Sequence, residues 1–363
     1  MFEMPGYTAP DFSAQHLAQA PDAVFIPSPA DGIAPDNYHA ASIYPEYFKV
    51  GGRWLLPEDS RMDCLAVLEE NSIAIREFRS IKKGDLVAVG RSERGEDGIY
   101  VHMDGFTKAS SAREQFSFRT GRSRETAYSR DYDSLYSLLR HEREHGCILW
   151  VLGPACAFDS DARRAMAALV DQGFVHALHA GNAIATHDLE AGLFGTGLGQ
   201  DIYSQELIHN GHYHHIDVIN KVRACGSIPE FIRQFSIEDG IMNACVKHSV
   251  PFVLSGSIRD DGPLPEVIAD VYRAQDAMRG LVRRATTVIC LATQLHTIAI
   301  GNMTPSYRVT KEGVRPLYFY TVDTSEFAVN KLRDRGSLSV TGLIANAQDF
   351  LRNVARGTGA LTS

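Results

Sequence analysis

The feature that most constrains the fold is a series of continuous apolar runs in the C-terminal two thirds of the chain. Each run is followed by a helical pattern, and the runs are CILWVLG (147–153), FVHALHAG (174–181), PFVLSG (251–256), TTVICLA (286–292) and LYFYTVD (317–323). Strands that are buried on both faces are apolar throughout, without alternation. Such runs alternating with amphipathic helices predict βαβ units, and therefore an α/β fold with a doubly wound parallel sheet.

The N-terminal third has a different pattern. Residues 63–106 contain short β-like segments that are separated by the turn sequences KKGD and ERGEDG. Short strands at a spacing of about 8–12 residues predict a small antiparallel sheet or barrel. We expect loops and short strands in the first 60 residues, and residues 111–130 form a basic, hydroxyl-rich connector. The predicted domains are therefore residues 1–130, β-rich and on the substrate side with oligomer contacts, and residues 131–363, the parallel-sheet domain.

Composition excludes several classes of partner. The formal net charge is −8 over 363 residues, whereas nucleic-acid binding requires a basic surface, so we expect no nucleic-acid partner. No apolar run approaches the roughly 18 residues of a membrane span, and the N-terminus lacks the pattern of a secretory signal. The six cysteines form no CxxC pair, which favours reduced thiols and a cytoplasmic location.

Small and acidic residues follow the predicted strands, where open parallel sheets bind their ligands. These strand-end groups are Gly153–Ala155, Gly181–Ala183, GSIRDDGPLP (256–265), Ala292–His296 and Asp323–Ser325, with Thr186, His187, Asp188 and Glu190 following the second group. Small residues let the backbone approach a ligand, helix N-termini favour anions, and an acid at a strand end suits ribose hydroxyls. The set predicts a dinucleotide crevice, although each residue type is also common in caps and turns.

Four other motifs could suggest a metal, a catalytic thiol or a dinucleotide fingerprint, and each is interpreted as structural or surface sequence instead. HEREH (141–145) matches a zinc motif, but Gly146 ends the helix and no third ligand follows, so we interpret it as a solvated helix end. HNGHYHH (209–215) has no cysteine or paired acid at metal-ligand spacing and is interpreted as a surface or substrate-facing loop. Cys156 and Cys245 are expected to be buried. GTGLG (195–199) follows a helix, which favours a turn over a dinucleotide fingerprint.

Four long segments together resemble the LOR/SDH-type family: residues 176–199, 241–268, 291–302 and 321–337. YFKVGGRWLLPEDSRMD (47–63) and KKGD (82–85) resemble its N-terminal part, so the likeness covers about residues 45–355. This family includes the archaeal-type, NAD-dependent ornithine cyclodeaminases and the C-terminal domain of the cyanobacterial arginine dihydrolase/ornithine cyclodeaminase. There is a fainter likeness to deoxyhypusine synthase. The resemblance implies an N-terminal β-rich domain followed by a Rossmann-like NAD domain.

Carried over residue by residue, the resemblance implies NAD as cofactor and a set of contacts. They fall on Gly181, Asn182, Ala183, Asp261, Thr293, Gln294, Leu295, His296, Asp323, Asn346 and Ala347. The family often has Asp where this chain has Asn346, which changes the hydrogen-bonding polarity there. Residues 303–316 are longer than the family pattern, and the connector FRTGRSRET (118–126) is less apolar.

The resemblance also implies a reaction, in which NAD takes a hydride from the α-carbon of L-ornithine to give an imine. The δ-amine attacks, ammonia leaves, and the returning hydride gives L-proline. Asp260 and Asp261 would hold the cationic substrate, His296 would carry protons, and Arg259 would clamp the substrate carboxylate. Asp260 could also cap the next helix, and His296 could bind only cofactor.

Two other functions stay open at this point. One is an NAD-dependent enzyme that acts on a related amino acid or diamine, such as an aminoalkyl transferase or an opine-type oxidoreductase. The other is a non-catalytic NAD-sensing or partner-binding module. In each case we expect a small-molecule ligand and a homo-oligomer, either dimer or tetramer.

Overall fold

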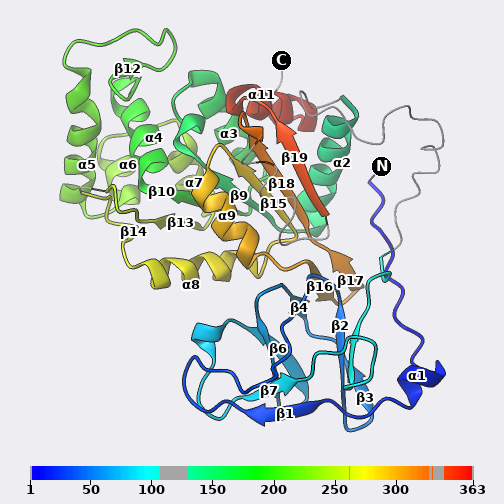
Figure 1. Cartoon of the computed structure of the whole chain (residues 1–363). Coiled ribbons are helices and arrows are strands. Elements are labelled where there is room, and N and C mark those ends of the chain that lie inside the picture. Colours follow the sequence, from blue (N-terminus) through cyan, green and yellow to red (C-terminus); the bar gives the residue numbers. More distant parts are fainter. Residues whose placement is uncertain (1, 107–128, 261, 327–328, 330–338, 362–363) are drawn as a thin grey trace.

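The computed structural model describes residues 2–106, 129–260, 262–326, 329 and 339–361. The chain forms a β-rich N-terminal unit below a larger unit built on a parallel sheet (Figure 1). The predicted boundary at residue 130 adjoins residues 107–128, which lie outside the described residues, as does the 118–126 connector. No helix among the described residues is long and apolar enough to cross a membrane.

The larger unit contains a seven-stranded parallel sheet in the order β14-β13-β10-β9-β15-β18-β19. The strands are β9 (Ile148–Leu152), β10 (Ala177–Gly181), β13 (Phe252–Ser255), β14 (Val267–Ile268), β15 (Thr287–Leu291), β18 (Tyr318–Asp323) and β19 (Ser339–Ile344). From β9 the chain builds outward to β14, then returns to the other side of β9 for β15 and builds outward again. This reversal makes the sheet doubly wound and confirms the predicted fold class. It also places the switch point between β9 and β15.

Helices cover both faces of this sheet. On one face, Trp150 and Leu178 belong to a core that also contains residues of α2 (Ser129–His145), α3 (Ser160–Asp171), α4 (Asn182–Phe194), α7 (Ile241–Lys247) and α11 (Ala347–Thr358). The same core reaches α5 (His214–Cys225) and α6 (Ile228–Gln234). On the other face, Val151 and Cys290 pack with α8 (Val271–Val282) and α9 (Gln294–Met303). Burial on both faces explains why the strands are apolar throughout.

The N-terminal unit contains two antiparallel sheets, in agreement with the prediction from its short strands and turn sequences. One has the order β1-β7-β5-β6 and the other the order β3-β2-β8. Their strands are β1 (Val24–Pro27), β2 (Glu46–Val50), β3 (Arg53–Leu55), β5 (Leu65–Glu69), β6 (Ser72–Arg76), β7 (Leu86–Val89) and β8 (Ile99–Val101), and α1 (Gln15–Ala18) precedes them.

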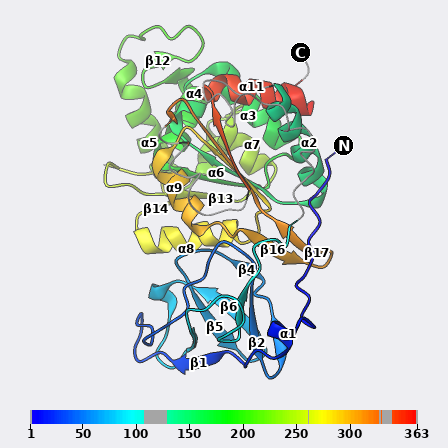
Figure 2. The same cartoon turned by 45° about the vertical axis from the view of Figure 1, so that its right-hand side comes forward.

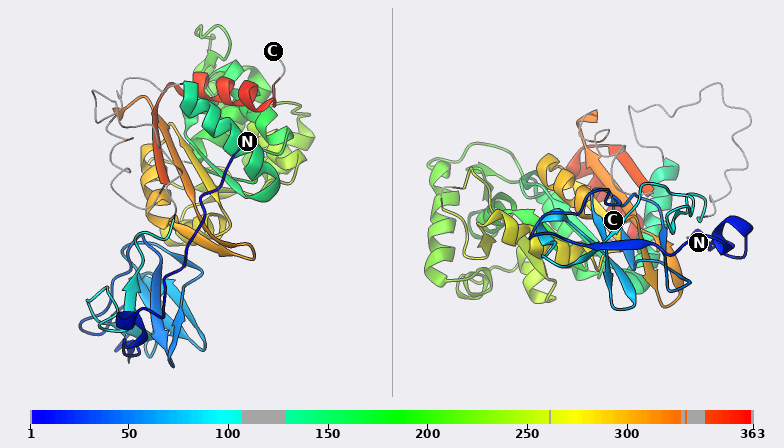
Figure 3. Two further views of the ribbon diagram at one scale, coloured as in Figure 1. Left: turned by 90° about the vertical axis from the view of Figure 1, so that its right-hand side faces the viewer. Right: turned by 60° about the horizontal axis from the view of Figure 1, so that its bottom comes forward.

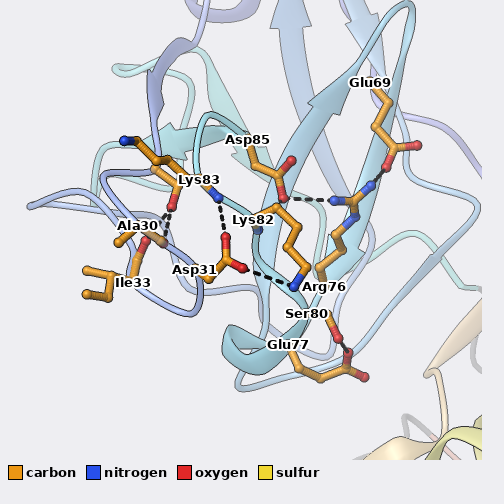
Figure 4. Close-up of polar contacts among 11 residues, drawn as sticks. Ala30, Asp31, Ile33, Glu69, Arg76, Glu77, Ser80, Lys82, Lys83 and Asp85 are labelled. Atoms are coloured by element: carbon orange, nitrogen blue, oxygen red, sulfur yellow. Dashed lines mark hydrogen bonds and ion pairs between the residues drawn. The ribbon is translucent and has the colours of Figure 1, made fainter.

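The KKGD turn before β7 is held by carboxylates (Figure 4). Asp85 accepts hydrogen bonds from the backbone N–H of Lys82 at 2.8 Å and from the guanidinium of Arg76 at 2.9 Å. Asp31 accepts from the backbone N–H of Lys83 at 2.9 Å and from Lys82 Nζ at 3.2 Å. The turn residues therefore tie the loop after β1 to the start of β7.

A hairpin of the larger unit joins the two parts of the molecule. The segment 303–316 contains β16 (Tyr307–Thr310) and β17 (Gly313–Pro316). β16 pairs with β4 (Asp59–Ser60) of the N-terminal unit, and Ser306 Oγ donates to the backbone oxygen of Ser60 at 3.1 Å. Figure 2 shows this hairpin between the two units.

Charged residues add a second contact between the units. Arg79, in the short helix η1 (Phe78–Ser80), pairs with Asp276 of α8 at 2.5 Å and lies over the ring of Tyr272. Glu77 beside it forms ion pairs with Arg61 and with Arg279 of α8. The N-terminal unit is therefore held against α8 as well as the hairpin, an arrangement that Figure 3 shows from two further directions.

Candidate functional site

A row of small residues ends the central strands at the carboxyl edge of the parallel sheet. Gly181 of β10 pairs with Ser255 of β13, and the same register continued by one residue brings Gly153, Ala292 and Asp323 alongside. We call these five residues the edge row. Its three central members carry at most a methyl group, and the row spans the switch point between β9 and β15. Doubly wound sheets bind their ligands at this place.

Two backbones meet closely at the centre of the edge row. A Cβ atom on Gly153 would lie 1.8 Å from the carbonyl oxygen of Ala292, so only glycine fits there. Ala292 has a φ of 54°, in the left-handed region, which costs an alanine roughly 1 kcal/mol. Such strain is retained where the surrounding structure imposes it, and it is often found at functional sites.

Two helices begin at the edge row with N-termini that are not capped by a side chain. α4 starts after Gly181 and α9 after Thr293, and neither N-cap residue accepts a hydrogen bond through its side chain. By contrast, Asp159 caps α3 through Ala162 N, and Asn346 caps α11 through Gln348 N. The first-turn N–H groups of α4 and α9 are therefore suited to an anion such as a pyrophosphate.

His296 lies in the first turn of α9, over the edge row. A Cβ atom built on Gly181 would be 3.1 Å from Cε1 of His296, and the His296 ring packs on His179 with ring centroids 4.8 Å apart. Burial lowers the pKa of His296, and the negative charge of Asp260 partly offsets this effect. The structure thus brings two of the predicted catalytic residues, His296 and Asp260, to the same end of the sheet.

The loop after β13 carries Asp260 and the third predicted catalytic residue, Arg259. Asp260 Oδ2 accepts a hydrogen bond from the backbone N–H of Ser257 at 2.8 Å, so it closes a turn within the loop. Arg259 is exposed, and its backbone N–H donates to Ser257 Oγ at 3.2 Å. Asp261 lies outside the described residues. Asn182 Oδ1 accepts from Leu264 N at 3.0 Å, which attaches this loop to the start of α4.

The other predicted cofactor contacts differ in exposure. Ala183, Gln294 and Leu295 are exposed beside the two helix N-termini. Asp323 is half-buried, and one of its oxygens accepts from Ser325 N at 2.8 Å. Asn346 uses its side-chain oxygen to cap α11, whereas the Ala347 side chain is buried in the core.

Comparison with known proteins agrees with this geometry. The family described as arginine dihydrolase ArgZ-like, C-terminal, Rossmann fold matches residues 135–354. The chain belongs to this family. It is 38% identical over 351 residues to the ornithine cyclodeaminase of Archaeoglobus fulgidus, covering 95% of this chain and 79% of that protein. The ornithine cyclodeaminase of Methanopyrus kandleri is 36% identical, with 91% and 77% covered.

Solved structures support the same assignment. The crystal structure of a conserved LOR/SDH protein from Methanococcus maripaludis has a TM-score of 0.84 and 33% identity, covering 93% of this chain and 98% of that one. The ternary complex of AgrE with ornithine and NAD+ has a TM-score of 0.59 and 30% identity. It covers 94% of this chain but 46% of AgrE, so the ArgZ-like chain described here spans about half of that protein.

Two acidic residues that follow β10, Asp188 and Glu190, are buried and form hydrogen bonds within the ArgZ-like fold. Asp188 pairs with Arg163 at 2.7 Å and accepts from the backbone of Ile241 and Met242 at the start of α7. Glu190, fully buried, accepts from His187 Nδ1 at 2.7 Å and from Thr196 Oγ1 at 2.9 Å. Hydrogen bonds from these neighbours lower the pKa of Glu190 despite its burial. The sequence alone did not separate these residues from ligand-binding ones.

The interpretation of HEREH as a solvated helix end is wrong for its glutamate. Glu142 is completely buried and pairs with Arg315 of β17 at 2.7 Å, while Thr287 Oγ1 donates to it at 3.2 Å. His141 packs against the ring of Phe2, with centroids 5.2 Å apart. Among the described residues, no group of three or more His, Cys, Asp or Glu is arranged to hold a metal.

His214 of the histidine-rich loop and the cysteines Cys156 and Cys245 pack within the protein. His214 Nδ1 lies 2.8 Å from Thr196 Oγ1, and the His214 ring stacks on Phe194. Cys156 and Cys245 are buried as predicted, and burial raises the pKa of each thiol to about 12. All six cysteines are unpaired.

One residue of the site was not predicted. His179 lies within β10, directly beneath His296, and is completely buried. The signal in the sequence was a histidine inside an otherwise apolar run, FVHALHAG. A buried polar residue in a central strand requires a hydrogen-bond partner, and this requirement could have identified His179 as a candidate site residue.

Proposed function

We propose that this chain is an NAD-dependent ornithine cyclodeaminase that converts L-ornithine to L-proline and ammonia. The observation that carries the proposal is the edge row of small residues between the two helix N-termini that no side chain caps. The names of the relatives support it, because proteins of 33–38% identity are named ornithine cyclodeaminase. The AgrE complex contains both ornithine and NAD+.

The described residues fit the cofactor. The N–H groups at the start of α4 (Gly181, Asn182, Ala183) and of α9 (Gln294, Leu295, His296) would bind the pyrophosphate, with Thr293 beside it. Asp323 would accept hydrogen bonds from ribose hydroxyls. Asp261, Asn346 and Ala347 stay predicted contacts. When bound, NAD would accept a hydride from the α-carbon of the substrate and return it after ring closure.

The side chains above the edge row would handle the substrate and its protons. Asp260 would attract the cationic amino acid, and its charge would favour a protonated His296 during amine oxidation. Arg259, exposed in the same loop, would bind the substrate carboxylate. His296 lies where it can accept a proton close to the cofactor site.

Two measurements test the proposal. Calorimetry should detect NAD binding at micromolar level or better, and mass spectrometry of product from labelled ornithine should show proline. Asp323→Ala should weaken NAD binding about tenfold while the protein stays folded, because one hydrogen-bonded charge is lost. Asp260→Asn should abolish most turnover and leave NAD affinity near the wild-type value.

The outcomes separate the alternatives. Absence of NAD binding at millimolar cofactor would refute the cofactor assignment. NAD binding without ornithine turnover would leave a panel of amino acids and diamines to be tested, and failure of the whole panel would favour an NAD sensor. Near wild-type turnover by Asp260→Asn would remove Asp260 from the reaction.

The proposal extends to assembly and location. We propose a homo-oligomer, because large apolar side chains are exposed on the segment 194–216, which joins α4 to α5. We also propose a cytoplasmic location, which the six unpaired thiols support.

A further inference from the structure

Two histidines at the site each leave one buried ring nitrogen without a hydrogen bond. His179 Nε2 and His296 Nδ1 have no hydrogen-bond partner, although the rings pack edge to face at 4.8 Å and 62°. Buried polar atoms in folded proteins are almost always bonded, and an exception calls for an explanation. Here two exceptions lie next to each other.

The hydrogen bond on the far side of His179 settles which of its nitrogens carries the proton. His179 Nδ1 lies 3.2 Å from the carbonyl oxygen of Val253. A carbonyl oxygen can only accept, so Nδ1 carries the proton and Nε2 carries a lone pair. Burial and the neighbouring His296 lower the pKa of His179 to about 3, so the ring is neutral near pH 7. His179 Nε2 is therefore a bare acceptor in a ring that packs against His296.

We propose that His179 is a positioning residue that holds the proton of His296 on Nδ1 and leaves His296 Nε2 as a bare acceptor over the edge row. The edge-to-face arrangement does not itself contain an N–H···N bond between the two rings, and forming one would satisfy both orphaned nitrogens at once. The Cε1–Nε2 edge of His296 is the part of the ring that lies over Gly181. The geometry thus directs the lone pair of His296 toward the place where a ligand would bind.

The chemical use of this lone pair rests on the proposed function. His296 Nε2 would take one proton from the substrate amine and become an imidazolium with a proton on each nitrogen. Among the described residues, His179 of β10 packs on His296, and the negative charge of Asp260 in the loop after β13 raises the pKa of His296. The Asp260 carboxylate would stabilise the imidazolium until the proton is returned. With the proton on Nε2 instead, that nitrogen could not accept a proton from the substrate.

The direct test is the tautomer of His296, read by NMR on the full-length protein labelled with ¹⁵N-histidine. The His296 signals are assigned by their loss in His296→Gln. We expect Nδ1 to be protonated and Nε2 to be unprotonated in the wild type. His179→Phe keeps the ring volume without the acceptor, so the proton should move to Nε2 or distribute over both nitrogens. His179→Gln keeps an acceptor near the position of Nε2 and should restore the wild-type tautomer.

Turnover provides a second readout. His179→Phe should lose at least about tenfold in ornithine turnover with NAD affinity nearly unchanged, and His179→Gln should recover most of the loss. His209→Gln, in the exposed histidine-rich loop, is the matched control and should change neither readout. A wild-type His296 protonated on Nε2, or the same tautomer in His179→Phe, would overturn the inference.

Failures of the two proposals can be told apart. If the wild type does not turn over ornithine, the proposed function fails, but the tautomer experiment still decides the role of His179. If His179→Phe does not fold, the wild-type tautomer and the His179→Gln variant still decide it.

Discussion

At the residue scale, the centre of the site depends on backbone fit as much as on side chains. Gly153 leaves no room for a Cβ atom, because the carbonyl oxygen of Ala292 occupies that position. Ala292 in turn adopts a left-handed conformation that an alanine seldom adopts. The switch point therefore brings two chain segments closer together than side chains would allow.

Gly153→Ala should destabilise the protein by about 3 kcal/mol, because the new methyl group collides with backbone that cannot move freely. Urea unfolding measures the change. Gly280→Ala is the matched control, since Gly280 lies in α8 with nothing within 4 Å of an added Cβ. It should stabilise by about 0.5–1 kcal/mol through helix propensity. Equal stability of the two variants would contradict this account.

His179 should make the folded state sensitive to acid. Its folded pKa is lowered to about 3, and its unfolded pKa is about 6.5, so neither state binds the proton above pH 7. Between these two pKa values only the unfolded state is protonated, which removes about 1.4 kcal/mol of stability for each pH unit of acidification. His179→Phe should lack this component, so its unfolding free energy should fall less between pH 6 and pH 5. Parallel curves for the two proteins would refute the prediction.

At the element scale, each strand of the hairpin β16–β17 contacts a different part of the molecule. β16 pairs with β4 of the N-terminal unit in a separate three-stranded sheet, and Arg315 of β17 pairs with the buried Glu142 of α2. The Glu142 carboxylate also accepts from Thr286 and Thr287 at the start of β15. This hairpin thus connects the N-terminal unit, helix α2 and the central sheet.

Arg315→Met should cost about 3–5 kcal/mol, because it leaves the Glu142 carboxylate buried without its cation. The double variant Glu142→Gln/Arg315→Met should recover part of this loss, which a double-mutant cycle in urea measures. Arg164→Met breaks the exposed pair with Asp161 and should cost less than about 1 kcal/mol. If the single and double variants lose the same stability, the pair is not what anchors the hairpin.

At the scale of the whole molecule, one segment of the described chain carries several exposed large hydrophobic side chains. The segment 194–216, which contains β11 (Thr196–Gly197) and β12 (Gln200–Asp201), projects from the larger unit (Figure 1). Its exposed large hydrophobic residues are Phe194, Leu198, Tyr203, Leu207, Ile208, Tyr213 and Ile216. Exposed apolar side chains gathered on one segment favour association with another protein surface.

The double variant Tyr203→Ser/Leu207→Ser should dissociate the proposed homo-oligomer, because these side chains are 82% and 81% exposed in the single chain. Light scattering on gel-filtered protein measures the mass. Val24→Ser, at an exposed position of β1, is the control and should leave the mass unchanged. A wild type that is monomeric at every concentration would remove the oligomer from the proposal.

The sequence by itself determined the parallel sheet, the β-rich N-terminal unit and the strand ends that carry the candidate site. The parallel sheet and the strand ends rest on local information, because an apolar run indicates burial on both faces and small residues mark where each strand ends. Gly181, Asn182, Thr293 and His296 were therefore assigned correctly to the carboxyl edge of the sheet.

Only the tertiary structure decided which polar residues are free for chemistry. Glu142, Asp188 and Glu190 resemble site residues in the sequence, yet each is buried and bonded to a partner from elsewhere in the fold. His179 was read as part of a strand, yet packing places it beneath His296. The partner of a polar group is set by long-range packing, because residues far apart in the chain meet only when the sheet and its helices assemble.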